Sequence, residues 1–242
     1  MWPFNKKYSL RETGVFNGWT DCHSHILPGV DDGIQHTRES LAILALYEEL
    51  GVEKVWLTPH IMEDCPNETE HLRHRFRHLT DAYYGEGLNF GDAGAKGKIE
   101  LRLAAENMID SLFTKRLADG DVMPYGDNGN QLLVETSYVQ PPVKFMSILK
   151  DIKAAGYYPV LAHPERYHYM DYEQYDSLHS QGVLFQLNLP SLVGAYGKEV
   201  KQRAEYILEN DFYAYQGSDV HSLHSLQRAI DEKALRTKHL EF

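Results

Sequence analysis

The sequence predicts an α/β barrel, in which parallel strands alternate with helices and close into a ring. Apolar runs that suit strands alternate about seven times with amphipathic stretches that suit helices, over 242 residues with no long Pro- or Ser-rich linker. His, Asp and Glu residues also stand just past nearly every predicted strand, and a closed barrel brings all those strand ends to one mouth. The alternative, an open doubly wound sheet, would spread them along an edge.

The expected elements of the first half follow from short-range patterns. Leu41, Leu44 and Ala45 share one helical face, and Gly51 ends that helix. In order, we expect an N-terminal arm at 1–17, a strand at 19–23, a helix at 37–50, a strand at 54–57, a helix that begins near 67–70, a Gly-rich loop at 85–97, a strand at 99–103, a helix at 107–117 and a strand at 131–134.

The second half repeats the same alternation. Phe145, Ile148, Leu149 and Ile152 form the inward face of a helix that ends before Gly156. The remaining expected elements are a helix at 142–155, a strand at 158–162, a helix at 171–180, a strand at 183–188, a helix at 196–209, a strand that begins at 212–215 and a helix from about 223 to 236. We therefore expect a single domain over 1–242.

Composition excludes several classes of function. The net charge of −11 disfavours nucleic-acid binding, because phosphate backbones are held by excess Lys and Arg. No stretch predicts a leader peptide or stable membrane insertion, and the two cysteines are too few for a disulfide framework, so a cytoplasmic protein is expected. The sixth residue after each cysteine is Pro28 or His71 instead of Arg, so the phosphate-binding loop of thiol phosphatases is missing.

The strongest chemical signal is a set of histidines and carboxylates. His23 and His25 point to the same side of an extended strand and can reach one cation. Imidazoles and carboxylates without thiolates suit Mn, Fe, Zn or Mg, and a centre with several ions can activate water for phosphoester hydrolysis. The nine candidate metal ligands are His23, His25, Asp32, His60, Glu106, Glu135, His163, Asp219 and His221.

These residues lie in motifs that resemble those of the PHP (polymerase and histidinol phosphatase) superfamily. Within it, the chain looks like the bacterial capsule-associated protein-tyrosine phosphatases. The matching motifs span nearly the whole chain in the family's order: DCHSH at 21–25, DDG at 31–33, TPH at 58–60, AE at 105–106, Glu135, AHPERY at 162–167 and GSDVH at 217–221.

The resemblance implies a distorted (β/α)7 TIM-like barrel of the PHP type, with three divalent ions at its mouth. Manganese is expected first, with iron, zinc or magnesium as alternatives. The implied ligand sets are His23, His25, Glu106 and Asp219 for one ion, Asp32, His60 and His221 for a second, and Glu106, Glu135 and His163 for a third, so that Glu106 bridges. Arg166 would face the substrate phosphate, with Asp219 and His221 also in the catalytic centre.

The same resemblance implies a substrate and a partner. The expected activity is hydrolysis of phosphotyrosine by a metal-activated water, in control of capsular or exopolysaccharide synthesis. The expected partner is a phosphotyrosine protein, namely a bacterial tyrosine kinase of polysaccharide export, and the oligomeric state stays open. The sequence departs from the family pattern at one point. The family often has an Arg soon after the last Asp-x-His motif, whereas the first Arg after His221 is Arg228.

Three alternatives remain at this point. A phosphatase for a small molecule, such as histidinol phosphate or a sugar phosphate, would share the metals and differ in the loops. A regulatory protein could use the metals only to hold the fold, although structural metal sites tend to be closed. A nuclease-like role is disfavoured by the negative charge. The basic segment at 71–78 is interpreted as a rim that attracts an anionic substrate.

Overall fold

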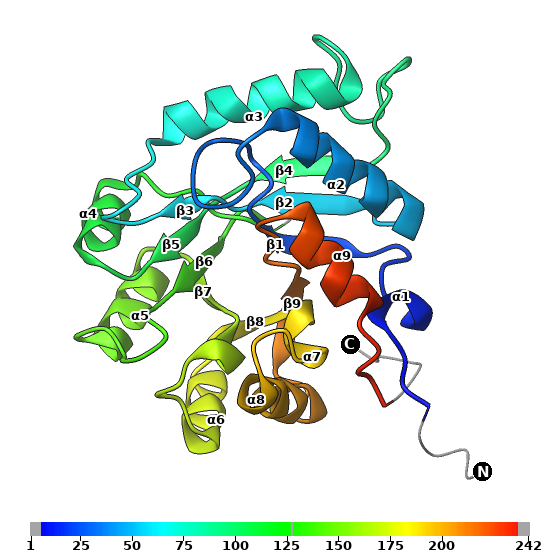
Figure 1. Ribbon diagram of the computed structural model, residues 1–242. Helices are drawn as coiled ribbons and strands as arrows, with labels where there is room; N and C mark the ends of the chain where they lie inside the picture. The colour runs from blue at the N-terminus through cyan, green and yellow to red at the C-terminus, as the bar shows by residue number, and fades with distance from the viewer. Residues whose placement is uncertain (1–5, 127, 237–242) are drawn as a thin grey trace.

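The computed structural model describes residues 6–126 and 128–236, which form two parallel β-sheets with helices around them (Figure 1). The smaller sheet has the strand order β1 (Thr20–Ser24), β2 (Lys54–Leu57), β4 (Glu100–Leu103). The larger sheet has the order β3 (His60–Ile61), β5 (Glu106–Met108), β6 (Gln131–Glu135), β7 (Tyr158–Ala162), β8 (Leu184–Asn188), β9 (Tyr213–Gly217). Every pairing is parallel, which confirms the predicted α/β class.

The predicted closure into one barrel is corrected to two adjoining sheets, since neither sheet closes within the described ranges. β2 and β3 are separated by Thr58 and Pro59, and proline has no N–H to donate to a ladder. β4 and β5 are separated by Ala104 and Ala105, and the N–H of Ala105 is directed to the carbonyl of Met123 (3.3 Å). The two sheets therefore part at this pair of joints.

The edge strands β1, of the smaller sheet, and β9, of the larger sheet, come together away from these joints. An isolated parallel bridge joins Ser24 to Val220, and the N–H of Asp219 donates to the carbonyl of His23 (2.8 Å). This contact places the segment after β9 beside the histidines of β1. All the strands thus point their carboxyl ends toward one region, although the hydrogen-bonded ring is incomplete.

The helices cover the outside of both sheets. They are α1 (Leu10–Thr13), α2 (Thr37–Leu50), α3 (Thr69–Tyr84), α4 (Ser111–Asp119), α5 (Phe145–Ala154), the 3-10 helix η2 (Pro164–Arg166), α6 (Tyr172–Ser180), α7 (Leu189–Leu192), α8 (Lys198–Glu209) and α9 (Leu223–Asp231). Figure 1 shows α2 and α3 against the smaller sheet, and α4, α5, α6 and α8 following one another around the larger one. None of the helices in the described part of the chain is long and apolar enough to cross a membrane.

Some predicted helix boundaries are wrong. The last helix, expected to about 236, ends at Asp231. The helix expected at 107–117 begins only at Ser111, because residues 106–108 pair as β5. The side chain of Asn107 supports the strand by donating to the carbonyls of Ala105 (3.2 Å) and Leu133 (3.0 Å). Asp110 then caps α4 by accepting the N–H of Phe113 (2.8 Å), a standard way to satisfy the first amides of a helix.

The described part of the N-terminal arm packs against α9 and Leu235. α1 begins with a capping box, in which Ser9 and Glu12 exchange hydrogen bonds. Arg11 pairs with Asp231 of α9 (2.7 Å), and Tyr8 bridges Leu235. Residues 1–5 of the predicted arm lie outside the described residues.

Candidate metal centre

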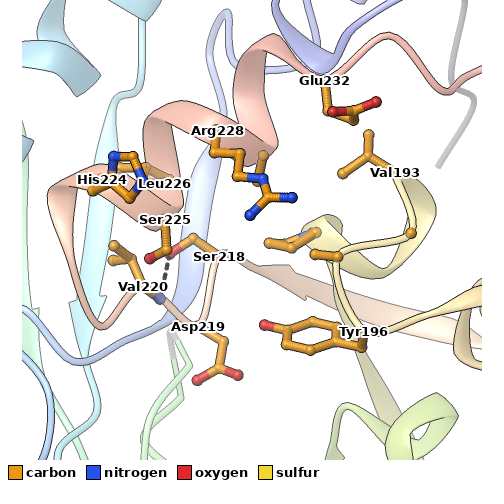
Figure 2. Close-up of a pocket in the computed structure, with 14 residues that line it drawn as sticks. Val193, Tyr196, Ser218, Asp219, Val220, His224, Ser225, Leu226, Arg228 and Glu232 are labelled. Atoms are coloured by element: carbon orange, nitrogen blue, oxygen red, sulfur yellow. Dashed lines mark hydrogen bonds between the residues drawn. The ribbon is translucent and has the colours of Figure 1, made fainter.

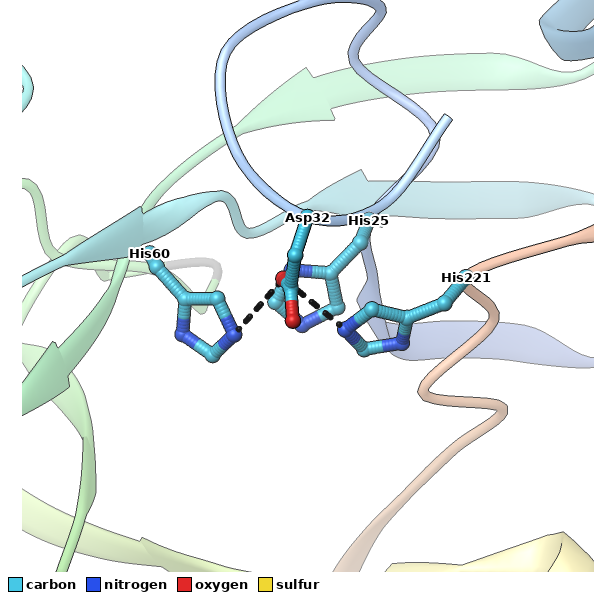
Figure 3. A group of neighbouring side chains, drawn as sticks. All are labelled: His25, Asp32, His60 and His221. Atoms are coloured by element: carbon cyan, nitrogen blue, oxygen red, sulfur yellow. Dashed lines mark ion pairs between the residues drawn. The ribbon is translucent and has the colours of Figure 1, made fainter. Parts of the chain in front are cut away.

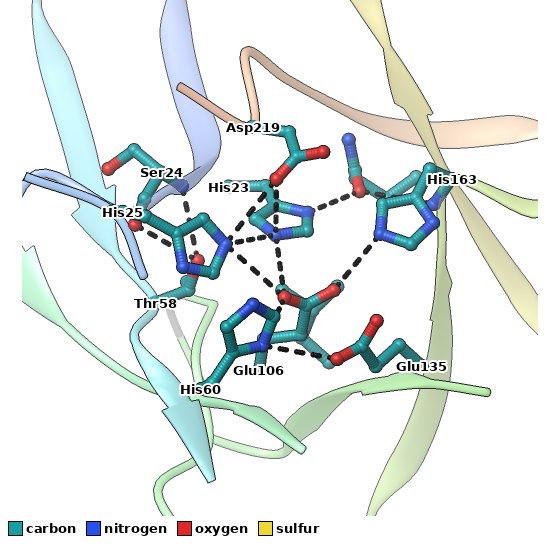
Figure 4. Close-up of polar contacts among 12 residues, drawn as sticks. His23, Ser24, His25, Thr58, His60, Glu106, Glu135, His163 and Asp219 are labelled. Atoms are coloured by element: carbon teal, nitrogen blue, oxygen red, sulfur yellow. Dashed lines mark hydrogen bonds and ion pairs between the residues drawn. The ribbon is translucent and has the colours of Figure 1, made fainter. Parts of the chain in front are cut away.

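The nine predicted ligands gather at the carboxyl ends of the strands, and Glu106 lies at their centre. Its Oε2 is 3.1 Å from both His23 Nε2 and His60 Nδ1 and 3.3 Å from His25 Nε2. Its Oε1 is 3.1 Å from His163 Nε2. Figure 4 shows these imidazoles converging on the carboxylate from β1, β3 and the segment after β7. The side chains of His23, His25 and Glu106 are fully buried, so the cluster is recessed.

A second group of side chains lies on the more exposed side of this cluster. Asp32 Oδ1 lies 3.5 Å from His60 Nε2 and 3.4 Å from His221 Nε2, and Figure 3 shows the aspartate between the two rings. The side chain of Asp32 is 74% exposed, whereas that of His60 is 13% exposed. The loop that carries Asp32 turns sharply at Gly33, where a Cβ would lie 2.3 Å from the carbonyl oxygen of His25. Glycine is therefore required there for Asp32 to reach the histidines.

The donor atoms form four groups, each of which is compact enough to hold one ion. The groups are His25, Asp32, His60 and His221; His23, His25 and Asp219; His23, Glu106 and His163; and His60, Glu106 and Glu135. They differ in part from the implied sets. His25 also joins the Asp32 group, and Glu135 lies with His60, whereas His163 lies with His23. All nine residues are nevertheless in one connected cluster.

The chemistry of the cluster fits divalent cations. Four buried atoms of the cluster have no hydrogen-bond partner among the described residues, namely His60 Nδ1, Glu106 Oε2, Glu135 Oε1 and His163 Nδ1. Burial and His25 lower the pKa of His60, yet the carboxylates of Glu106 and Glu135 raise it to about 10. Burial raises the pKa of Glu106, but His23 and His60 hold it well below its usual range. A buried site that attracts positive charge this strongly, with imidazole and carboxylate donors, suits Mn, Fe or Zn.

Two residues outside the predicted set orient the histidines. Asp31 Oδ2 lies 2.9 Å from His25 Nδ1 and also accepts the backbone N–H of His60 (3.1 Å). Gln186 Oε1 lies 2.8 Å from His23 Nδ1. Each contact occupies Nδ1 and leaves Nε2 directed to the cluster, as in other metal-binding histidines. Gln186 is fully buried in β8 between Phe185 and Leu187, and an amide between two apolar residues of a strand is the sequence signal that could have revealed it.

Two candidate ligands lie at strained backbone positions. His163 (φ 35°) directly follows β7, and Asp219 (φ 51°) is the second residue after β9. Both lie in the left-handed region that non-glycine residues rarely adopt. The Asp219 turn is held by Asp21, which accepts the N–H (2.9 Å) and hydroxyl (2.6 Å) of Ser218. Tyr47 also donates to Asp21 (2.8 Å). The fold thus fixes the direction of these side chains before any ion binds.

Arg166 lies at the edge of the cluster. Its Nη1 donates to Asp219 Oδ2 (2.6 Å), and its guanidinium lies between the rings of Tyr138 (4.5 Å) and Tyr196 (4.2 Å). The other oxygen of Asp219 faces His25 Nε2 (3.4 Å). Asp219 therefore links Arg166 to the cluster through a salt bridge. Whether Arg166 also contacts phosphate stays a prediction.

A cavity of about 470 Å³ adjoins Asp219. Figure 2 shows Arg228 reaching into it from α9, with Tyr196 and Asp219 at its lower end.

The basic side chains of α3, interpreted from the sequence as a rim, contact other residues in the structure. Arg73 and Arg77 pair with Glu70, whereas Arg75 donates to the carbonyl of Pro28 in the loop that carries Asp32.

Comparisons with known proteins find similar chains among tyrosine-protein phosphatases. Tyrosine-protein phosphatase YwqE of Bacillus subtilis (strain 168) is 25% identical over 220 residues, which cover 84% of this chain and 77% of that protein. Tyrosine-protein phosphatase CpsB of Streptococcus pneumoniae is 27% identical over 241 residues, with 87% and 88% covered.

A solved structure shows the same fold. It comes from work on YwqE from Bacillus subtilis and CpsB from Streptococcus pneumoniae, described as unique metal-dependent tyrosine phosphatases. It matches with a TM-score of 0.76 and 24% identity, covering 87% of this chain and 84% of that one. The family profile for capsular polysaccharide synthesis, CpsB/CapC, matches residues 19–238. The chain therefore belongs to the CpsB/CapC family of capsular polysaccharide synthesis, which confirms the resemblance to capsule-associated tyrosine phosphatases.

Proposed function

We propose that this chain is a metal-dependent protein-tyrosine phosphatase. The observation that carries the proposal is the recessed cluster around Glu106, in which nine imidazole and carboxylate side chains offer four overlapping groups of ligand atoms. An aryl phosphate extends farther from the peptide backbone than the phosphate of phosphoserine, so it reaches a buried cluster that the shorter side chain does not. The names of the relatives, tyrosine-protein phosphatases YwqE and CpsB, support the same activity.

In this proposal the nine residues hold three divalent ions, with manganese as the first expectation and Glu106 as a shared ligand. When bound, the ions would supply a water of lowered pKa and a clamp on the phosphoryl oxygens. Asp31 and Gln186 keep the Nε2 atoms of their histidines directed inward. Asp219 and His221 complete the catalytic centre, in which Asp219 is buried and His221 is partly exposed.

Arg166 provides the positive charge next to the ions. Only one of its nitrogens donates to Asp219, and the tyrosine rings on both faces hold the guanidinium plane in place. A fixed planar fork suits a phosphate, because it donates two parallel hydrogen bonds without reorganising. Arg166 would thus stabilise the charge that develops on the phosphoryl group.

The family membership supports a role in capsular or exopolysaccharide synthesis. We propose that the substrate is a phosphotyrosine protein in the cytoplasm, namely a bacterial tyrosine kinase of polysaccharide export. The single domain over 1–242 would carry the whole activity.

The test strips the protein of metal, adds back one metal at a time and measures hydrolysis of several phosphoester substrates. We expect manganese to restore hydrolysis of a phosphotyrosine peptide, at a kcat/KM well above that for the matched phosphoserine peptide and for histidinol phosphate. If histidinol phosphate is preferred by about tenfold or more, the small-molecule phosphatase replaces this proposal. If no metal restores hydrolysis of any phosphoester, the enzyme proposal itself fails.

A further inference from the structure

An apolar surface lies beside the metal centre, on the loop that follows β6. We call Tyr138, Val139, Pro141, Pro142 and Val143 the apolar ledge. Val139 is 75% exposed and Val143 is 85% exposed, although the chain as a whole is strongly charged. Met146 and Tyr172, on the adjacent helices α5 and α6, are also exposed. Contiguous exposed apolar side chains of this kind mark a binding surface more often than isolated ones do.

The ledge continues into a groove on the surface of the molecule. The cavity there has a volume of about 400 Å³ and lies between the ledge and the helices α5 and α6. Its apolar lining comes from Pro141, Phe145, Met146, Tyr169, Met170 and Leu178. A groove of this size accommodates one or two apolar side chains of a bound peptide.

Tyr138 connects the ledge to the metal centre. Its ring lies 4.5 Å from the guanidinium carbon of Arg166 and 5.8 Å from the ring of His163. Its carbonyl accepts the N–H of His168 (2.8 Å), which fixes the start of the loop. The loop begins directly after Glu135, so the ledge is part of the rim around the cluster. A polypeptide that places a side chain in the cluster can therefore contact this rim.

We propose that the apolar ledge and its groove bind apolar residues that flank the phosphotyrosine of the substrate. The inference rests on the proposed function, because it takes a phosphotyrosine peptide as the substrate. A second copy of this chain is the other candidate occupant. A copy seated on the ledge would cover Tyr138 and Arg166 and obstruct entry to the cluster, so the geometry favours the substrate.

The decisive variant is Val139→Asp together with Val143→Asp, which places two charges on the ledge. Both side chains are largely exposed, so folding and metal content should not change. We expect kcat/KM for a phosphotyrosine peptide with Leu and Val flanks to fall about tenfold, the scale of one buried apolar side chain. Hydrolysis of p-nitrophenyl phosphate and of a peptide with Ser and Gly flanks should stay within about twofold of the wild type.

The matched control is Phe90→Asp. Phe90 is 49% exposed in the loop between α3 and β4, which lies away from α5 (Figure 1). We expect this variant to resemble the wild type on all three substrates. An equal loss on p-nitrophenyl phosphate in the ledge variant would mean that the ledge acts through the catalytic centre, which contradicts the inference.

A binding measurement separates this inference from the proposed function. Fluorescence anisotropy with a peptide that carries a non-hydrolysable difluorophosphonate in place of the tyrosine phosphate needs no turnover. We expect the metal-loaded ledge variant to bind the Leu- and Val-flanked peptide about tenfold more weakly than the wild type. Equal Kd values would overturn the inference even if the enzyme is active. A wild-type dimer that dissociates in the variant, measured by light scattering, would assign the ledge to a second copy.

Discussion

Replacing Asp31 by Asn tests whether the residues behind the histidines control the metal centre. Oδ2 of Asp31 contacts His25 Nδ1 and the N–H of His60, so one oxygen orients two candidate ligands. Asn keeps the size of the side chain but removes its charge. If its amide NH2 faces His25, it donates to Nδ1, whereas the Asp31 carboxylate accepts a hydrogen bond from Nδ1–H. His25 then loses the tautomer preference that leaves Nε2 free for an ion.

The expected magnitude follows from how many ligand groups the change reaches. Loss of one such outer partner lowers metal affinity by about tenfold to a hundredfold. His25 and His60 each belong to two of the four ligand groups, so we expect a loss near the upper end of this range. The fold itself should persist, since Oδ1 keeps its contact with the N–H of Gly33 (3.0 Å).

The assay is calorimetric titration of metal-stripped protein with Mn²⁺, followed by elemental analysis after dialysis. Asp64→Asn is the matched control, because Asp64 is an exposed aspartate in the nearby segment after β3. We expect the control to bind manganese as the wild type does. An Asp31→Asn protein whose affinity stays within about twofold of the wild type would refute the orienting role.

Four further variants test the remaining assignments. Glu106→Gln should release more than one equivalent of metal and Glu135→Gln about one, because Glu106 contacts four histidines; equal losses by elemental analysis would argue against a shared ligand. Arg166→Ala should retain its metals yet lose about a hundredfold in kcat/KM, and near-normal kinetics would leave it only as the partner of Asp219. Alanine at both Cys22 and Cys65 should keep most turnover, because burial raises the pKa of the Cys65 thiol and Cys22 lies in an apolar cluster; a folded, metal-loaded but inactive protein would contradict the water mechanism.

The positions of the candidate ligands could be predicted because they depend on short-range rules. Alternation along a strand puts His23 and His25 on one face, and parallel strands end at one edge. Closure of the sheet depends instead on backbone pairing across the joints at Pro59 and Ala105, which no periodicity encodes. The helix expected from 107 was wrong because strand pairing at Asn107 outweighed a local helical pattern.

The orienting partners were harder to identify for a different reason. Gln186 is distant in sequence from His23, and a single sequence carries no signal that pairs them. The pairing of Arg166 with Asp219 was similarly hidden, although both residues were predicted members of the centre. Residue types and spacing therefore predicted the set of side chains, whereas their mutual contacts required the structure.

The division into two sheets would couple metal binding to folding. His23 and His25 come from the smaller sheet or directly follow it, whereas His60, Glu106 and Glu135 come from the larger one. An ion shared by both sets is a cross-link that exists only while both sheets are assembled. At a free metal concentration a hundred times the Kd, one site adds about 2.7 kcal/mol to the free energy of unfolding. Metal supply would therefore set how long the folded protein survives as well as how fast it turns over.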